Sequence, residues 1–253
     1  MFAVERQKYI LDQLAEYGAV LVNKLSAELN VTEETVRRDL EKLENQELLV
    51  RTHGGAIPLE ENNIELSLEK RKKLNSDIKM KLAKEAVKMI ARGDTVFLDA
   101  STTTFYMAKE IKKMNNVTVV TNSLRVINEL SNSNDITVIS VGGIVSNNQS
   151  FVGTHTESII RDNFFVNKMF FSSRGITING EILESNEREC GVKKSMLNNS
   201  SEKIYLCDKS KVGRVGFAKL CTITDIDCMI TEKVADEKLL NNLAENGILV
   251  SEI

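Results

Sequence analysis

Hydrophobic positions in the first 58 residues repeat at helical spacing three times. Residues 5–17 predict an amphipathic helix that ends at Gly18, and after a short extended connection residues 22–29 predict a second, shorter helix. Thr32 is a suitable N-cap for a third helix, in which Val36, Leu40 and Leu43 form the buried stripe. Two short helices joined by a tight turn are typical of a helix-turn-helix.

A β-hairpin is predicted directly after the third helix. The sequence LLVRTHGGAI contains a short apolar run, a tip region at Gly54-Gly55 and an apolar return. Pro58, the only proline of the chain, closes this unit. The pattern therefore predicts a winged helix-turn-helix domain over residues 1–58.

From residue 76 the pattern changes to alternating strands and helices. Residues 59–75 mix acids, amides and a basic run, which is typical of a linker. The predicted strands are 95–98, 117–120, 136–141, 168–172, 204–207, 228–231 and 248–250. The predicted helices are 77–91, 103–114, 123–130, 155–163, 187–198 and 236–246. This alternation predicts an α/β domain over residues 76–253 with a mostly parallel, open, doubly wound sheet.

Composition places the chain among ordinary globular proteins, with 42% hydrophobic and 27% charged residues. No stretch approaches the roughly 20 apolar residues that span a bilayer, and the charged N-terminus lacks a signal-peptide core, so we expect a cytoplasmic protein. The four cysteines lack metal-ligand spacing and are expected to be reduced, mostly core residues. Since there are also only two histidines, we expect no metal and no cofactor.

Net charge gives no general sign of nucleic-acid binding. The chain has a net charge of −3, and residues 1–58 contain seven Lys or Arg against ten Asp or Glu. Any DNA affinity must therefore come from the few cations that touch the DNA. A recognition helix places its N-terminal residues on base edges in the major groove, and a wing contacts the DNA backbone or the minor groove. The predicted DNA contacts are accordingly Thr32, Thr35, Arg37 and Arg38 on the helix, and Arg51, His53 and Gly54 on the wing.

A structural interpretation of the same residues is equally compatible with their spacing. Arg37 and Arg38 would then be solvated helix charges paired with neighbouring glutamates, and His53 would be a structural residue of the hairpin.

Hydroxyl-rich turns follow the first predicted strands of the α/β domain. The strand at 95–98 runs through Asp99 into Ala100-Ser101-Thr102-Thr103-Thr104, which opens a helix. Hydroxyls and free N–H groups at a helix N-terminus, beyond the carboxyl end of a parallel strand, suit a phosphate. Thr121-Asn122-Ser123 repeats this arrangement, and Gly142-Gly143 follows the third strand. We expect these three strand ends to converge on one crevice; the alternative is that the hydroxyls only cap helices.

Charged residues extend the candidate site. Asp208 and Lys211 follow a fourth strand, where the lysine can pair with a phosphate and the aspartate with a sugar hydroxyl. Lys193 and Glu189 on a helix are weaker candidates. The predicted effector residues are Asp99, Ser101, Thr102, Thr103, Thr121, Asn122, Ser123, Gly142, Gly143, Lys193, Asp208 and Lys211.

The run VTEETVRRDLEKLENQELLVRTHGGAI, residues 31–57, resembles the DeoR family of bacterial repressors. The segments FLDASTTT, VVTNS, VGG, ECGVKKSM and CDKSKVGR are similar to the sensor domain of that family, whose fold resembles ribose-5-phosphate isomerase. The chain departs from the family pattern at three places. Glu47 stands where a glycine is usual, and Ser101-Thr102-Thr103 stands where Gly-Thr-Thr is usual. Residues 172–175 stand where G-x-D-G is usual.

The resemblance implies a repressor of a sugar-catabolic operon that binds double-stranded operator DNA and responds to a phosphorylated sugar. We also expect a homo-oligomer, dimer or tetramer, because a single short recognition helix covers too few base pairs for specificity and paired heads contact paired half-sites. An isomerase-like enzyme with an accessory DNA-binding head is the alternative, with Asp99, Glu187, Glu189 or Asp208 as a general base. A constitutive DNA-binding protein whose α/β domain only dimerises is the third. We expect a regulator without enzymatic turnover.

Overall fold

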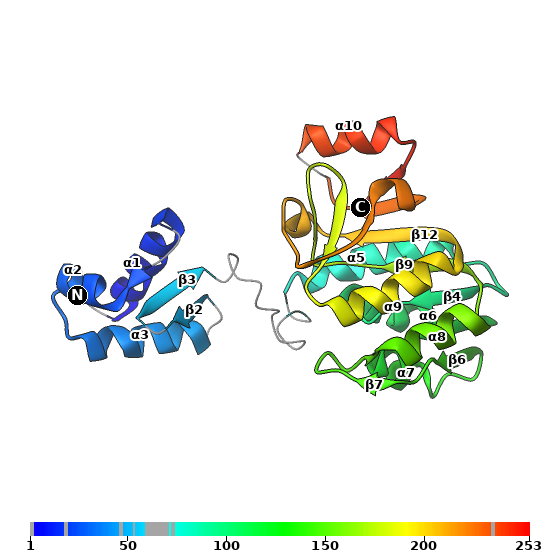
Figure 1. Ribbon diagram of the computed structural model, residues 1–253, viewed down its shortest axis with the longest axis horizontal. Coiled ribbons are helices and arrows are strands. Elements are labelled where there is room, and N and C mark those ends of the chain that lie inside the picture. The colour runs from blue at the N-terminus through cyan, green and yellow to red at the C-terminus, as the bar shows by residue number, and fades with distance from the viewer. Residues whose placement is uncertain are drawn as a thin grey trace. The chain divides into compact units, whose positions relative to one another are not determined.

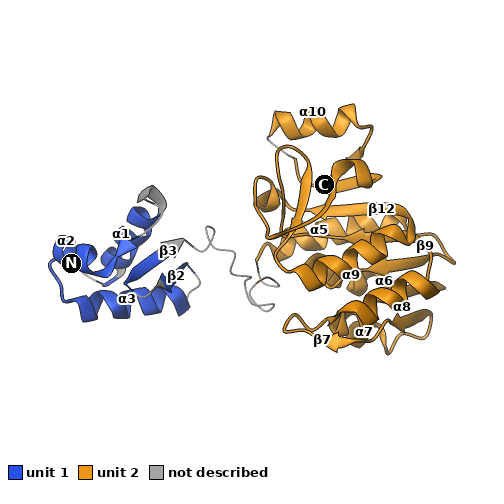
Figure 2. Ribbon diagram, in the orientation of Figure 1, with its two compact units in different colours: residues 1–64 blue, residues 65–253 orange. Residues whose placement is uncertain are grey.

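The computed structural model describes residues 3–17, 20–45, 48–52, 54–58, 71, 74–233 and 236–253. The chain divides into two compact units, residues 1–64 and 65–253, which are coloured separately in Figure 2. In these described ranges, no helix is both long and apolar enough to cross a membrane.

The described part of the first unit contains three helices and a small antiparallel sheet. The helices are α1 (Ala3–Tyr17), α2 (Val22–Leu29) and α3 (Glu33–Asn45), and the strands are β1 (Val20–Leu21), β2 (Leu49–Thr52) and β3 (Gly55–Pro58) in the order β1-β3-β2. Ile10, Leu25, Val36, Leu40 and Leu43 lie in its core. The helix-turn-helix and the hairpin are confirmed, and the short connection before α2 is in addition a strand of the wing sheet.

The turn between α2 and α3 is fixed by local hydrogen bonds. Asn30 adopts a left-handed conformation with φ 50°, and the Ser26 hydroxyl donates to the carbonyl of Val31. The Thr32 hydroxyl then accepts from the Thr35 N–H at 3.3 Å, which is the N-cap bond predicted from the sequence.

The two wing glycines have different surroundings. A Cβ on Gly55 would lie 1.8 Å from the carbonyl oxygen of Val20, so the pairing of β3 with β1 requires glycine there. A Cβ on Gly54 would meet nothing within 4 Å. His53, a predicted DNA contact, and Glu47, a departure from the family pattern, lie outside the described residues.

The second unit is built on a seven-stranded sheet whose order is β15-β14-β12-β9-β4-β5-β6 (Figure 1). All neighbouring strands are parallel. The strands are β4 (Thr95–Leu98), β5 (Val117–Thr121), β6 (Ile136–Ser140), β9 (Val166–Phe171), β12 (Ser200–Cys207), β14 (Cys228–Thr231) and β15 (Leu249–Glu252). Each coincides with a predicted strand to within a few residues, and the predicted α/β class is confirmed.

Helices cover both faces of this sheet, as alternation along the strands requires. Val96 and Leu98 of β4 pack with α5 (Ser76–Ala86), α6 (Thr102–Ile111) and α7 (Leu124–Leu130). Phe97 lies in the second core, to which α8 (Thr154–Asn163), α9 (Glu187–Asn198) and α10 (Glu237–Glu245) contribute. The predicted helix 77–91 ends early, because its last turn, Val87–Met89, is a 3-10 helix.

Short strands outside the main sheet were not predicted. One antiparallel sheet has the order β10-β11-β13, from Gly175–Ile176, Glu181–Glu184 and Ala218–Thr222. Another pairs β7 (Ile144–Val145) with β8 (Phe151–Val152).

All four cysteines are buried in the second unit as free thiols. Burial raises the pKa of Cys190, of Cys228 to about 11, and of Cys207 and Cys221 to about 12. Their predicted place in the core is confirmed.

The order of the strands determines where a ligand fits. From β4 the chain winds outward through β5 to β6 and then returns to place β9 on the other side of β4. The loops that follow β4 and β9 therefore diverge, and such a switch point is the usual binding crevice of an open α/β sheet.

Candidate functional site

A pocket opens at this switch point, at the carboxyl ends of β4, β9 and β12. Its empty volume, mouth included, is ≈ 780 Å³. Its lining is rich in charge, with six Lys or Arg and three Asp or Glu. The lining residues are Arg71, Leu74, Asn75, Lys79, Ala100, Ser101, Thr102, Thr103, Asn148, Ser172, Ser173, Arg174, Glu184, Ser185, Glu189, Lys193, Asp208, Ser210, Lys211 and Arg214.

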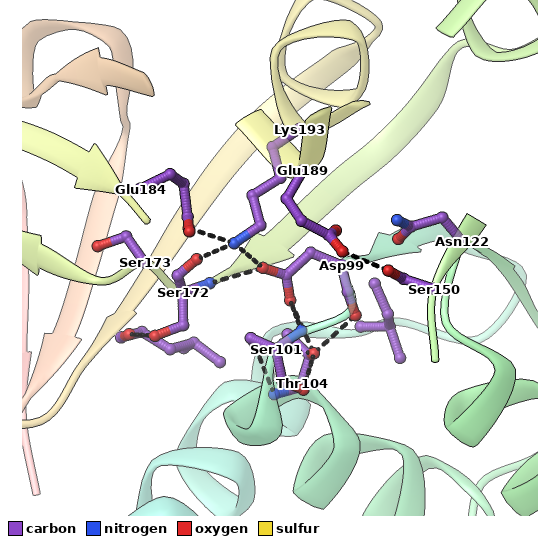
Figure 3. A network of polar contacts seen from close by, with 12 residues as sticks. Asp99, Ser101, Thr104, Asn122, Ser150, Ser172, Ser173, Glu184, Glu189 and Lys193 are labelled. Carbon is purple, nitrogen blue, oxygen red and sulfur yellow. Dashed lines mark hydrogen bonds and ion pairs between the residues drawn. The ribbon is translucent and has the colours of Figure 1, made fainter. Parts of the chain in front are cut away.

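Asp99 lies beneath the pocket lining and holds two of the loops that form it. It is completely buried, and its Oδ1 accepts from the Ser101 N–H at 3.1 Å and from the Thr104 hydroxyl at 2.8 Å. Its Oδ2 accepts from the Ser172 N–H at 3.2 Å, so one carboxylate joins the loops after β4 and β9 (Figure 3). Asp99 was predicted to contact the effector, but it does not line this pocket; Ser101, which caps α6 through the Thr104 N–H, does.

Lys193 occupies the centre of the same network. Its Nζ lies 2.9 Å from Asp99 Oδ2, contacts Glu184 Oε1 and donates to the Ser172 carbonyl at 2.6 Å (Figure 3). Burial acts to lower the pKa of Lys193, but the two carboxylates outweigh it and raise that pKa overall. Because three protein groups already take the three donors of this ammonium, it neutralises buried carboxylates and is a poor candidate for holding an anion.

Two other lysines give the pocket a cationic end. The Lys79 ammonium is buried and donates to the carbonyls of Arg71 and Leu74, at 2.5 and 2.7 Å. The Lys211 ammonium donates to the Ser173 carbonyl. Burial and, next in size, the charge of Lys211 lower the pKa of Lys79 to about 8, and burial also lowers that of Lys211. An anion bound here would relieve the repulsion between the two ammonium groups.

Asp208 lies beside these lysines at the end of β12. Its Oδ1 accepts from the Ser210 N–H at 3.2 Å, from the Ser210 hydroxyl and from Asn75 Nδ2 at 3.3 Å. Burial acts to raise the pKa of Asp208, but Lys211 and Ser210 outweigh it and lower that pKa overall. The group is therefore a charged hydrogen-bond acceptor.

Glu189 on α9 forms a second acceptor on another side of the pocket. Its Oε1 accepts from the Ser146 hydroxyl at 3.1 Å. It also accepts from the Ser150 hydroxyl, as Figure 3 shows. Burial raises the pKa of Glu189. Ammonium groups and carboxylate acceptors thus line one pocket.

Besides Asp99, five predicted effector residues lie outside the pocket lining. Thr121 donates to the Leu98 carbonyl at 2.7 Å, Asn122 Nδ2 donates to the Phe151 carbonyl, and Ser123 caps α7. The Gly142 carbonyl accepts from the Thr156 hydroxyl at 2.8 Å, and a Cβ on Gly143 would lie 1.9 Å from that hydroxyl. The expected convergence of three successive strand ends does not describe this pocket, because β5 and β6 lie on the side of β4 away from β9.

Sequence reasoning missed residues that follow β9, residues that precede α5, and Lys79 on α5. Ser172, Ser173 and Arg174 follow β9, which is far from β4 in the sequence but adjacent to it in the sheet. Arg71, Leu74 and Asn75 were placed in the predicted linker. Lys79 precedes Leu82, Ala83 and Ala86 by three, four and seven positions, so its place on the apolar face of α5 was a usable signal.

Helix α3 presents the predicted DNA contacts at its exposed start. Thr32, Arg37 and Arg38 are exposed and Thr35 is half-buried. Arg37 pairs with Glu33 at 2.6 Å and Arg38 with Glu34 at 3.4 Å, each one turn apart. These are the ion pairs that the structural interpretation expected, and exposed pairs of this kind are weak enough for a phosphate to displace them.

Ion pairs also join α3 to its neighbours. Arg51 of β2 contacts Glu44 at 2.7 Å. Asp39, on the buried face of α3, pairs with Arg6 of α1 at 2.7 Å. These pairs fix the orientation of the exposed face of α3.

Comparisons with known proteins match both units. A model of the DeoR-like helix-turn-helix domain matches residues 6–62, and one of the DeoR C terminal sensor domain matches residues 74–233. An uncharacterized HTH-type transcriptional regulator of Bacillus subtilis, YulB, is 36% identical over 100% of this chain and 98% of its own. The lactose phosphotransferase system repressor of Streptococcus mutans is 35% identical over 93% and 94%.

Solved structures similar to the chain include ribose 5-phosphate isomerase A of Methanocaldococcus jannaschii, at 19% identity over 55% of each chain with a TM-score of 0.41. The family models, which match both units, and the relatives, which match over nearly the full length, identify the family of this chain. This chain belongs to the DeoR family of DNA-binding transcriptional regulators, which is not a family of enzymes.

Proposed function

We propose that this protein is a cytoplasmic repressor of a sugar-utilisation operon, and that a phosphorylated sugar bound in the pocket controls its affinity for operator DNA. The observation that supports this most directly is that two ammonium groups, those of the buried Lys79 and the half-buried Lys211, line one pocket with the acceptor Asp208. A phosphate fits the cationic end, and Asp208 and Glu189 accept from sugar hydroxyls. The S. mutans relative, named as a lactose phosphotransferase system repressor, agrees with this class of regulon.

On the DNA side, we propose that Thr32, Thr35, Arg37 and Arg38 contact the operator from the major groove and that Arg51, His53 and Gly54 contact it from the wing. A single short recognition helix covers few base pairs, so we propose that a homo-oligomer binds paired half-sites.

A thermal-shift screen tests the effector. The panel contains ribose 5-phosphate, glucose 6-phosphate, fructose 1-phosphate and fructose 6-phosphate, each beside its unphosphorylated sugar. Stabilisation by one ester and not by its parent sugar is expected, because a ligand that binds only the native state raises Tm. No shift with any ester would contradict the proposed effector class and favour a constitutive regulator.

Operator binding tests the direction of control. The DNA is selected from a random-sequence library with the ligand-free protein, and its Kd is measured with and without the stabilising ester. A weaker complex with the ester is expected of an inducible repressor, whereas a tighter complex would contradict induction.

A further inference from the structure

Three residues that line the pocket, Arg71, Leu74 and Asn75, belong to the chain just before α5; we call them the anchor residues. Residues 59–70 connect them covalently to the DNA-binding unit. A ligand in the pocket is therefore in reach of the first described residues that follow this connection.

The Lys79 ammonium binds the anchor residues from inside the pocket. It donates to the carbonyls of Arg71 and Leu74, which are the only two partners it has in the described part of the chain. An ammonium has three donors, so one remains for an anion in the pocket. The same charged group thus holds the backbone of the anchor residues and faces the ligand.

Asn75 connects the anchor residues to the opposite wall. Its Nδ2 donates to Asp208 Oδ1 at 3.3 Å and to the Ser210 hydroxyl at 3.1 Å, both at the end of β12. It adopts the left-handed conformation, with φ 53°. Arg71 donates to Asn148 Oδ1 at 2.6 Å on a third side of the pocket.

We propose that the anchor residues are the part of the sensor through which a bound phosphate ester changes the placement of the DNA-binding unit. This inference rests on the proposed function. The ester accepts a hydrogen bond from the remaining donor of Lys79 and pairs with the ammonium of Lys211. Binding thereby stabilises the hydrogen bonds from Lys79 to the anchor carbonyls and from Asn75 to the end of β12. The ester then favours the states in which the connection to the DNA-binding unit starts from a fixed point.

Two substitutions, each compared with the wild type at saturating ester, test signal transmission. Asn75→Gly keeps the left-handed backbone without strain and removes both amide bonds to the end of β12. Asn116→Gly is the matched control, because Asn116 has φ 57° and lies before β5, outside the pocket lining. The full-length protein is used throughout, with inorganic phosphate and the most stabilising ester of the thermal-shift panel as probes.

In the wild-type protein and in Asn116→Gly, the probes are expected to slow hydrogen exchange over residues 74–79. The ester is also expected to change operator Kd by about 5–150-fold, the usual range of allosteric coupling. In Asn75→Gly, at an ester concentration that saturates this variant in the thermal-shift assay, the change in operator Kd should fall below about fivefold.

Each failure has its own signature. If Asn75→Gly binds the ester and its operator Kd still responds as in the wild type, or if residues 74–79 exchange equally fast with and without a bound probe, the role of the anchor residues is refuted. If no ester shifts Tm in the wild type, the proposed function itself fails and this inference fails with it.

Discussion

Arg38 is the more exposed of the two arginines at the start of α3, at 74% of its side chain against 54% for Arg37. Its partner Glu34 is also exposed, so removing the guanidinium should cost little folding stability. The effect of this residue on operator binding can therefore be measured without a large change in folding stability.

We predict that Arg38→Ala weakens operator binding by about 5–150-fold, which corresponds to the 1–3 kcal/mol of one good base contact. Fluorescence anisotropy with the selected operator measures this. Arg161→Ala is the control, since Arg161 on α8 is comparably exposed and also paired with an acid, Asp162. Equal Kd values for both variants and the wild type would support the interpretation of Arg38 as a solvated helix charge.

The pKa of Lys79 predicts how ligand binding depends on pH. The free pocket holds that pKa at about 8, below the ordinary 10.5 of lysine, chiefly through burial. The ammonium is therefore charged at pH 7 and mostly neutral at pH 9, while a phosphate ester remains a dianion above its second pKa near 6. The charged groups that face Lys79 are Lys211, Asp208, Arg71 and Arg125.

We predict that affinity for the stabilising ester falls by up to about tenfold between pH 7 and pH 9. Calorimetric titrations at pH 7, 8 and 9 measure this, and Lys79→Met should show weaker binding with a flatter profile. An unchanged affinity at pH 9 would argue against Lys79 as a phosphate contact. In the absence of ligand, Lys79 makes folding stability depend on pH in the opposite direction. Between pH 8 and 10.5 the folded state binds fewer protons at this lysine than the unfolded state does. The free energy of unfolding therefore rises with pH over this range.

The lack of a side chain at Gly55 allows strand β3 to occupy the centre of the three-stranded wing sheet. Gly55 allows β3 to pair with β1 on one side while β2 pairs on the other. The wing and the helix-turn-helix are thereby joined, since β1 leads directly into α2.

We predict that Gly55→Ala destabilises the DNA-binding unit by about 3 kcal/mol, the upper end for an overpacked site, because its Cβ would overlap the Val20 carbonyl. Gly54→Ala, whose Cβ meets nothing within 4 Å, should change the free energy of unfolding by less than about 1 kcal/mol. Urea unfolding followed by circular dichroism compares the two variants, and equal midpoints would contradict the assigned pairing.

Elements could be predicted from the sequence where their signal is local. The alternation of strand and helix patterns identified all seven strands of the main sheet, and the predicted ranges 22–29 and 187–198 coincide with α2 and α9. Strand order is not local, so the insertion of β9 between β4 and β12 could not be foreseen, and Ser172 to Arg174 were missed for that reason. Strands of two residues, such as β10, contain too few positions for a periodicity.

At the scale of the whole molecule, the two units have separate hydrophobic cores. Substitutions in separate cores without shared partners are expected to act additively. The proposed DNA contacts all belong to the first unit and the proposed effector contacts to the second.

We predict opposite losses from substitutions in the two units. Arg38→Ala should weaken operator binding and leave the thermal shift by the ester intact. Lys211→Ala combined with Asp208→Asn should abolish that shift and leave ligand-free operator binding intact. Anisotropy and thermal-shift measurements on the same preparations decide this, and loss of both activities in both variants would disprove the division of function.

The burial of every cysteine in the second unit makes the native thiols a reporter of that unit alone. Thiolate is the reactive form, and both low exposure and a raised pKa suppress it in all four residues. Alkylation by a neutral maleimide should therefore require local or global unfolding of the second unit. Unfolding of the DNA-binding unit, which contains no cysteine, should not change the rate of alkylation. Labelling kinetics with and without an ester would then measure how much a bound ligand closes the sensor, without an engineered probe.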